Sequence, residues 1–109
     1  MKMVIAIVQN EDANLLTEAL MENHFSVTKL ATTGGFLRVG NTTLLIGVED
    51  DQVEKVIDLV KEVAKCREQI ITTTTPSAYG SEMFSTYPVK VQVGGATIFV
   101  VDVERFEKI

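Results

Sequence analysis

The chain has 109 residues and a mass of 12.0 kDa, with 46% hydrophobic and 23% charged residues; this indicates a single domain over residues 1–109 and excludes a disordered or collagen-like chain. The single cysteine, Cys66, excludes an intrachain disulfide framework, and the apolar run at residues 3–8 is too short for a signal peptide or a membrane span, so we expect a cytoplasmic protein without membrane association. The net charge of −5 argues against binding to polymeric DNA or RNA.

The first part of the chain predicts a strand, a helix and a second strand. Residues 3–8 are continuously apolar and rich in β-branched side chains, which is typical of a strand buried on both faces and therefore central in a sheet. A helix is expected from Asn10 to about Asn23, with Asn10 or Asp12 as its N-cap. Residues 25–30 alternate between apolar and polar side chains and therefore predict a strand.

A second set of elements follows in the same order. A glycine-punctuated loop is expected at residues 31–41, a buried strand at residues 43–48, a helix that begins at the acidic residues 49–51, and a strand at residues 67–74. Apolar side chains recur along this helix with a clear helical period: Val53, Val56, Ile57, Val60, Val63 and Ala64. Because strand, helix and strand occur twice, we expect an α+β, ferredoxin-like fold with split βαβ topology and both helices on one face of an antiparallel sheet.

The remaining segment predicts a second long loop and the last strands. Residues 75–88 contain two prolines and many small polar side chains, which favours a surface loop. Residues 89–93 alternate like an exposed strand, and the adjacent glycines 94–95 predict a turn. Residues 96–103 are expected to form a buried strand, and residues 104–108 a short helical turn.

Patterns that indicate catalysis or metal binding are scarce. His24 is the only histidine, and Cys66 is expected at the end of the second helix between Lys65 and Arg67, without a nearby base. No spacing of histidine, cysteine or acidic residues suggests a metal site. We therefore expect no catalytic residues, no metal ligands and no cofactor, and a protein that is not an enzyme.

One segment favours binding of a small anionic ligand. Residues 23–48 contain no acidic side chain and carry a charge of +2, whereas the remainder of the chain carries −7. Gly34 and Gly35 match neither the Walker nor the dinucleotide-binding spacing, but their backbone amides can form a concavity for an anion. We expect Phe36 to pack on the core, on a partner subunit or on a flat ring such as a nucleobase, and the Asn41 amide can pair with an adenine edge. Residues 28–41 thus suit a ligand that combines phosphate with an aromatic base.

The run TKLATTGGFLRVGNTT at residues 28–43 resembles the ligand loop of the PII-like cyclic di-AMP receptors, the PstA or DarA type. Residues 1–9 look like the first strand of that family and residues 93–99 like its last, and the similarity extends over essentially the whole chain. The resemblance implies a PII-like core that assembles as a homotrimer and binds cyclic di-AMP in three clefts between subunits. It also implies a receptor without catalytic activity, in which ligand binding changes loop conformation and signals to an unknown downstream protein.

The resemblance also implies a set of ligand-binding residues: Ser26, Val27, Thr28, Gly35, Phe36, Leu37, Asn41, Gly47, Phe99 and Lys108. Thr28 is expected to contact a phosphate, Phe36 to stack on a base, and Asn41 and the Gly47 backbone to read an adenine edge. Phe99 is expected to form a wall of the site, and Lys108 to close the cleft from the neighbouring subunit. Ser26 stands where many relatives have arginine, and Lys108 where many have glutamine.

Three other functions are compatible with the same fold. The first is a PII-like sensor of ATP or another mononucleotide, which is less favoured because the loop supplies only Lys29 and Arg38 as cations. The second is a small enzyme such as a phosphatase, for which no base or nucleophile stands nearby in the sequence. The third is a purely structural oligomer, which leaves the glycine-rich loop without a role.

Overall fold

The computed structural model describes residues 1–30, 40–76 and 84–109, with the backbone alone described at residues 71–76 and 84–87. The elements in chain order are β1 (Lys2–Gln9), α1 (Asn10–Glu22), β2 (Val27–Leu30), β3 (Asn41–Val48), a short 3-10 helix (Asp50–Gln52), α2 (Val53–Ala64), β4 (Arg67–Pro76), β5 (Phe84–Val93) and β6 (Ala96–Asp102). None of the helices in these ranges is long and apolar enough to cross a membrane.

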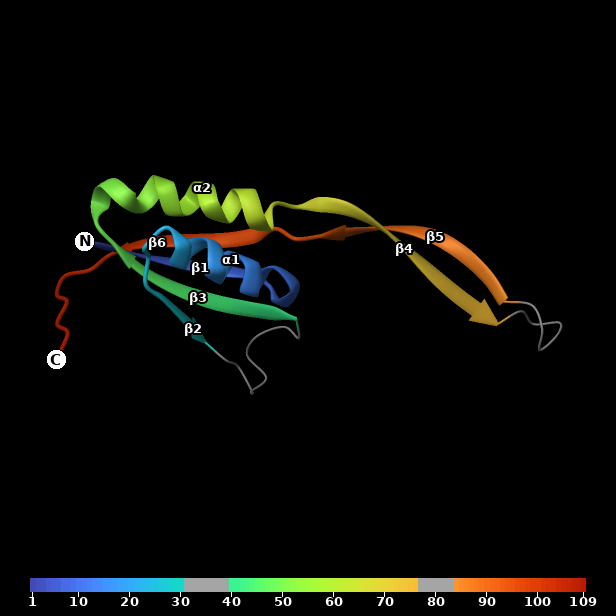
Figure 1. Ribbon diagram of the computed structural model, residues 1–109, viewed down its shortest axis with the longest axis horizontal. Helices are drawn as coiled ribbons and strands as arrows, with labels where there is room; N and C mark the ends of the chain where they lie inside the picture. The colour runs from blue at the N-terminus through green and yellow to red at the C-terminus, as the bar shows by residue number, and fades with distance from the viewer. Residues whose placement is uncertain (31–39, 77–83) are drawn as a thin grey trace.

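Four strands form an antiparallel sheet in the order β2-β3-β1-β6, and both helices cover one of its faces (Figure 1). This arrangement confirms the predicted α+β, ferredoxin-like fold. The central position predicted from residues 3–8 is confirmed, because β1 pairs with β3 on one side and with β6 on the other. The expected burial on both faces was wrong, because only alternate residues of β1 are fully buried and helices cover one face alone.

The core lies between the sheet and the two helices. Alternate residues of the central strands face the helices, and the helix face predicted from the apolar period of α2 packs against them. The largest fully buried side chains are Val4, Val8, Leu16, Leu20, Leu44, Ile46, Val56 and Val60. The alternation means that the other residues of β1 and β3 face away from the helices, onto an uncovered face.

Strand β6 differs from its prediction. Residues 96–103 were expected to be buried, but β6 forms one edge of the sheet, and Phe99 is 53% exposed. Val100 and Val101 are each 40% exposed. The prediction was wrong because an apolar run indicates a buried strand only when other elements cover both of its faces.

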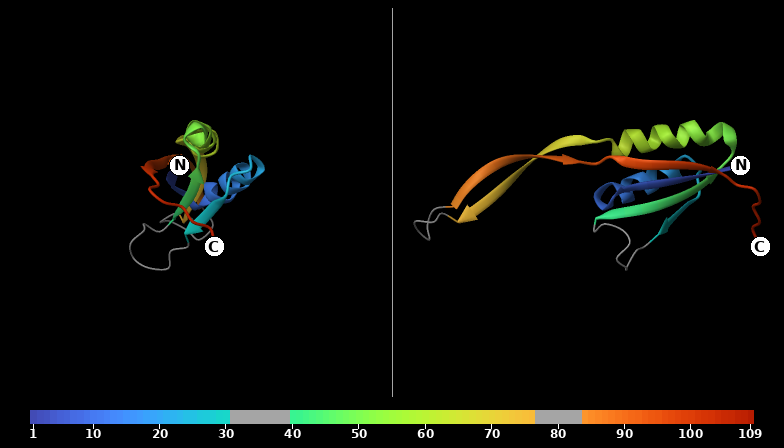
Figure 2. Two further views of the ribbon diagram at one scale, coloured as in Figure 1. Left: turned by 90° about the vertical axis from the view of Figure 1, so that its left-hand side faces the viewer. Right: turned by 180° about the vertical axis from the view of Figure 1, so that it is seen from behind.

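A two-stranded ribbon, β4 and β5, projects from the end of the core (Figures 1 and 2). It pairs antiparallel from Arg67 opposite Val93 to Pro76 opposite Phe84. The chain consequently extends 66 Å in its longest dimension, and its radius of gyration is 18.8 Å. A compact chain of this length has a radius of gyration of about 13 Å, so the ribbon reaches well beyond the core.

The ribbon corrects two predictions. Residues 67–74 do form a strand, but it pairs with β5 in a separate sheet, and β6 supplies the fourth strand of the core. Much of the loop expected at residues 75–88 belongs to β4 and β5, and residues 77–83 lie outside the described residues. Pro76 and Pro88 are compatible with this ribbon because both strands of a two-stranded sheet are edges, where an amide that faces away from the partner strand is not required for pairing.

Three predictions at the helix ends and at the C-terminal segment were also wrong. Gln9 is the N-cap residue of α1, and neither Asn10 nor Asp12 caps it, because their side chains bind Thr42 and Arg67 instead. Helix α2 ends at Ala64, so Cys66 lies beyond it, with its Sγ 3.0 Å from Gln92 Oε1. The expected turn at residues 104–108 does not form, and these residues are exposed.

Candidate functional site

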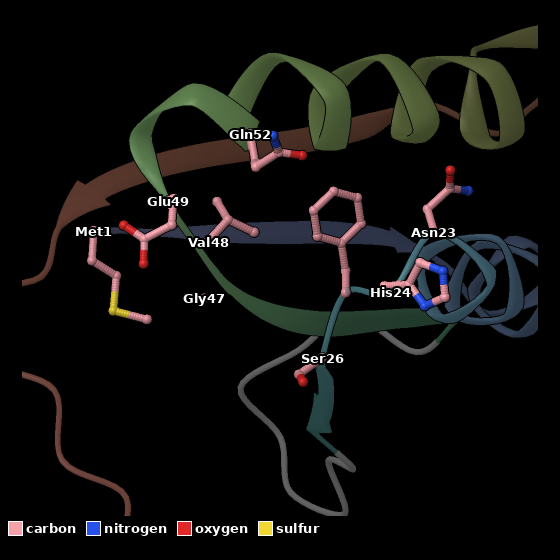
Figure 3. A pocket seen from close by; sticks show the side chains of 9 residues that line it. Met1, Asn23, His24, Ser26, Gly47, Val48, Glu49 and Gln52 are labelled. Carbon is pink, nitrogen blue, oxygen red and sulfur yellow. The ribbon is translucent and has the colours of Figure 1, made fainter.

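A pocket of about 330 Å³ lies at the end of the sheet where α1 stops. It is lined by residues from the α1 terminus, the start of β2, the end of β3 and the segment before α2: Met1, Asn23, His24, Phe25, Ser26, Gly47, Val48, Glu49 and Gln52. Figure 3 shows Met1 and Glu49 on one side and His24 and Asn23 on the other, with Ser26 between them. Two of the predicted site residues, Ser26 and Gly47, therefore share one pocket.

The α1 terminus turns the chain so that Ser26 reaches this pocket. The His24 N–H donates to the Met21 carbonyl at 3.0 Å, and the Phe25 N–H donates to the Leu20 carbonyl at 3.0 Å. These two bonds form a Schellman motif, whose turning residue adopts a left-handed conformation and is usually glycine. Here that residue is His24, with a φ of 68°. The turn directs Phe25 against the core and leaves Ser26 exposed.

Gly47 opens the pocket on the β3 side. It pairs with Met3 of β1 and lies one residue beyond the last β2–β3 pair, which joins Val27 and Ile46. A Cβ atom at this position would meet only Met1 Cε, at 3.6 Å. The absence of a side chain therefore leaves the strand backbone accessible to a molecule in the pocket.

Charged groups beside the pocket are paired with one another. The Met1 amine lies 3.0 Å from an Asp50 carboxylate oxygen. Lys2 and Asp102 form a salt bridge between β1 and β6, and their hydrogen bond lowers the pKa of Asp102 and raises the pKa of Lys2. The pocket itself offers amide, hydroxyl and imidazole groups together with the Glu49 carboxylate, a lining suited to hydrogen bonding of a polar ligand.

Three further predicted residues lie on the uncovered face of the sheet or beside it. Cross-strand pairing places Thr28, Leu45, Ile5 and Phe99 in one row across all four strands, and directly paired residues share a face. Thr28, the predicted phosphate contact, and Phe99, the predicted wall of the site, therefore lie on the same face of the sheet. Val27 points the other way and packs against the core, so only its backbone can face a ligand on this side.

Asn41 lies apart from the pocket. It begins β3, whereas Gly47 is close to its end, and six residues of strand span roughly 20 Å. Asn41 lines a second cavity of about 310 Å³, together with Ile7, Gln9, Gly94, Gly95, Ala96 and Thr97. Within one chain, the predicted residues therefore spread along the uncovered face. Lys108 lies in the exposed segment after β6, and Gly35, Phe36 and Leu37 lie outside the described residues.

Comparison with known proteins identifies the family. Residues 1–109 match the family model described as cyclic-di-AMP receptor. The chain belongs to the cyclic-di-AMP receptor family. It is also similar to a solved structure, the crystal structure of a functionally unknown protein from Pediococcus pentosaceus ATCC 25745. The two sequences are 44% identical over 99% of this chain and 96% of that chain, with a TM-score of 0.78. The family predicted from residues 28–43 is thereby confirmed.

The pocket of this cyclic-di-AMP receptor family member contains residues that the sequence did not indicate as site residues. Asn23, Glu49 and Gln52 come from two helix ends and a strand end that meet only in the folded chain. Among these pocket residues, His24 has an unusual backbone conformation, a positive φ. The sequence does not indicate this conformation, because a positive φ is expected mainly at glycine. Within the described ranges, no group of three histidine, cysteine or acidic side chains is arranged to hold a metal ion.

Proposed function

We propose that the protein is a non-enzymatic receptor that binds cyclic di-AMP in the clefts of a homotrimer and signals to a downstream protein by a change in conformation. The observation that carries this proposal is the match of residues 1–109 to the cyclic-di-AMP receptor family. The proposal includes one domain, a cytoplasmic location, and neither a metal nor a cofactor.

The chemistry of the uncovered face supports this ligand. Cyclic di-AMP presents two flat adenine rings and two phosphates. Phe99 offers an exposed aromatic ring, and base stacking on such a ring contributes roughly 1–3 kcal/mol. Thr28 offers an exposed hydroxyl in the same row, and Gly47 an open stretch of backbone. A hydroxyl and an open backbone can bind phosphate and base edges by hydrogen bonds without requiring many cations.

The same face supports assembly. The side chains of Leu30, Phe99 and Val101 are 41%, 53% and 40% exposed, although large apolar side chains are more stable when covered. Phe106 and Ile109 extend this apolar character into the segment after β6. A trimer that buries these side chains between subunits would also bring Lys108 of one chain near the site of the next.

In the proposed mechanism, cyclic di-AMP lies in a cleft between subunits and contacts residues 26–47 and 99–108. Phe36 stacks on one base, and binding shifts the equilibrium between conformations of the segment after β2 and of the β4–β5 ribbon. A ligand can shift such an equilibrium only through unequal affinity for the two conformations. The exposed ribbon then presents the bound state to a partner.

Isothermal titration calorimetry with cyclic di-AMP tests the ligand and its stoichiometry. We expect saturable binding of one ligand per chain, and a loss of roughly 5- to 150-fold in affinity for Phe36→Ala if the ring stacks on a base. Leu15→Ala is a matched control, because Leu15 is exposed on α1, which covers the opposite face of the sheet. Absence of binding to folded trimer would refute the proposal. Titration with ATP in the same assay distinguishes a mononucleotide sensor.

A further inference from the structure

The base of the β4–β5 ribbon is attached to the junction of β1 and α1 by polar contacts. The Gly94 N–H donates to Gln9 Oε1 at 2.8 Å. The Arg67 guanidinium donates to both carboxylate oxygens of Asp12, at 2.9 and 3.4 Å, and to the Lys65 carbonyl at 3.1 Å. Hydrogen bonds thus connect the base of each ribbon strand, at Arg67 and at Gly94, to residues 9–12.

The same junction holds the residues that follow the 31–39 segment. The Asn10 N–H donates to the Gly40 carbonyl at 2.7 Å, and the Thr42 hydroxyl donates to Asn10 Oδ1. Gln9 is the register partner of Asn41, the predicted adenine contact. Residues 9–12 therefore contact the start of β3 through Gln9 and Asn10, and the ribbon through Gln9 and Asp12.

The contact between Asp12 and Arg67 cannot loosen without cost. Asp12 is only 2% exposed, and a buried carboxylate that loses its partner is strongly unfavourable. The hydrogen bond to Asp12 also raises the pKa of Arg67. The packing around the pair is tight, since a Cβ on Gly94 would overlap the Lys65 carbonyl and lie 2.6 Å from an Arg67 nitrogen. The Arg67 side chain is itself 41% exposed, so the pair attaches the ribbon base to the core mainly through the buried Asp12 carboxylate.

Apolar packing contributes little to the position of the ribbon. Among residues 67–70 and 88–93, no side chain is buried, and Ile70 is 65% exposed. Besides the covalent connections to α2 and β6, the polar contacts of the junction and the bond from the Gly95 N–H to the Ala64 carbonyl are consequently the main described links between the ribbon base and the core.

We propose that Gln9, Asn10 and Asp12 are positioning residues that couple the start of β3 to the base of the ribbon. This inference rests on the proposed function, in which a ligand contacts Asn41. A displacement of Gly40–Thr42 moves Asn10, which is two residues from Asp12 in the first turn of α1, and Asp12 carries Arg67 with it. Such coupling is reciprocal, so loosening the ribbon base also changes the affinity at the other site.

Hydrogen exchange in the ligand-free full chain tests the coupling. The reporters are the amides of Gly94 and Gly95, which bond to Gln9 and to the Ala64 carbonyl. Thr42→Val removes the hydroxyl on Asn10 with little change of volume, and Asp12→Asn removes the charge that holds Arg67. We expect each variant to accelerate exchange at both glycines by about 2- to 30-fold relative to β1 amides, with non-additive effects in the double variant. Additive effects, or equal acceleration in β1, would overturn the inference.

Cyclic di-AMP provides the second measurement. We expect ligand to slow exchange at the two glycines in the wild type and much less in Asp12→Asn, and we expect Arg67→Lys to restore part of the response of Arg67→Met. Asp102→Asn breaks an exposed salt bridge elsewhere and serves as the matched control. Ligand binding with an unchanged response in Asp12→Asn overturns the coupling but retains the receptor function. Absence of ligand binding, with non-additive exchange in the free protein, refutes the receptor function and retains the coupling. If Asp12→Asn does not fold, Thr42→Val and Arg67→Lys supply the same comparison.

Discussion

Replacing Gly47 by alanine separates the stability of the fold from the use of the pocket. Gly47 lies in β3, and the only atom within 4 Å of a Cβ built there is Met1 Cε, at the ordinary contact distance of 3.6 Å. Glycine within a strand is less favourable than alanine by roughly 0.5–1 kcal/mol, so Gly47→Ala should stabilise the chain by about that amount. For a domain of this size, the corresponding rise in Tm is about 2–6 °C.

The same methyl group would project into the pocket beside Ser26. If the ligand lies against the Gly47 backbone, crowding costs roughly 1–3 kcal/mol, which is a loss of about 5- to 150-fold in affinity. Thermal unfolding without ligand and calorimetry with cyclic di-AMP, at matched chain concentration, measure the two effects. Gly94→Ala is the contrasting control, because its φ of +81° and its overlap with the Lys65 carbonyl predict a loss of stability.

Either half of this prediction can fail separately. A lower Tm for Gly47→Ala would show that a methyl group at this position clashes with its surroundings in the folded chain. An unchanged affinity, with the expected rise in Tm, would show that the ligand does not lie against Gly47, and the pocket shared with Ser26 would lose its assignment.

Three further predictions concern the pocket turn, the edge of the sheet and the core. His24→Gly should raise the free energy of unfolding by about 1 kcal/mol, because glycine adopts the positive φ of 68° without strain. His24→Ala should not raise this free energy, and equal gains for the two variants in thermal unfolding would exclude the backbone conformation as the cause. Because the hydrogen bond from Lys2 lowers the pKa of Asp102, the salt bridge should stabilise the chain above the ordinary aspartate value of 3.8 and be lost as the pH falls through the lower folded value. Urea unfolding should therefore show Asp102→Asn slightly less stable than wild type at pH 7, and a difference that persists undiminished into strong acid would contradict this. Leu16→Ala should cost about 2–5 kcal/mol, since Leu16 is fully buried, and a smaller loss in urea unfolding would show that the core closes around the cavity.

The sequence determined those elements that bury one regular face. The continuous apolar run at residues 3–8 predicted the central strand, and the period from Val53 to Ala64 predicted the buried face of α2, because burial against a core imposes a pattern on consecutive residues. The glycine-rich run at residues 28–43 predicted the family, which the comparison confirmed.

The tertiary structure decided what has no local pattern. Residues 75–88 show no apolar period that distinguishes strand from loop, and Arg67–Pro76 pairs with β5 rather than with the core. At the described base of the ribbon, residues 67–70 and 88–90 are exposed, so no burial imposes a pattern on them. Likewise, Asn10 and Asp12 are residue types that often cap helices. Their side chains instead form hydrogen bonds with Thr42 and Arg67, which are 32 and 55 residues away in the sequence.

For the candidate site, too, the sequence indicated some features and the tertiary structure decided others. Residue types suited to phosphate and adenine were visible along residues 26–47, but their arrangement was not. Whether Ser26 meets Gly47, and whether Thr28 shares a row with Phe99, depends on strand register and on the order of the sheet. Register is set by pairing between distant segments, because a shift of one residue moves every side chain of a strand to the opposite face.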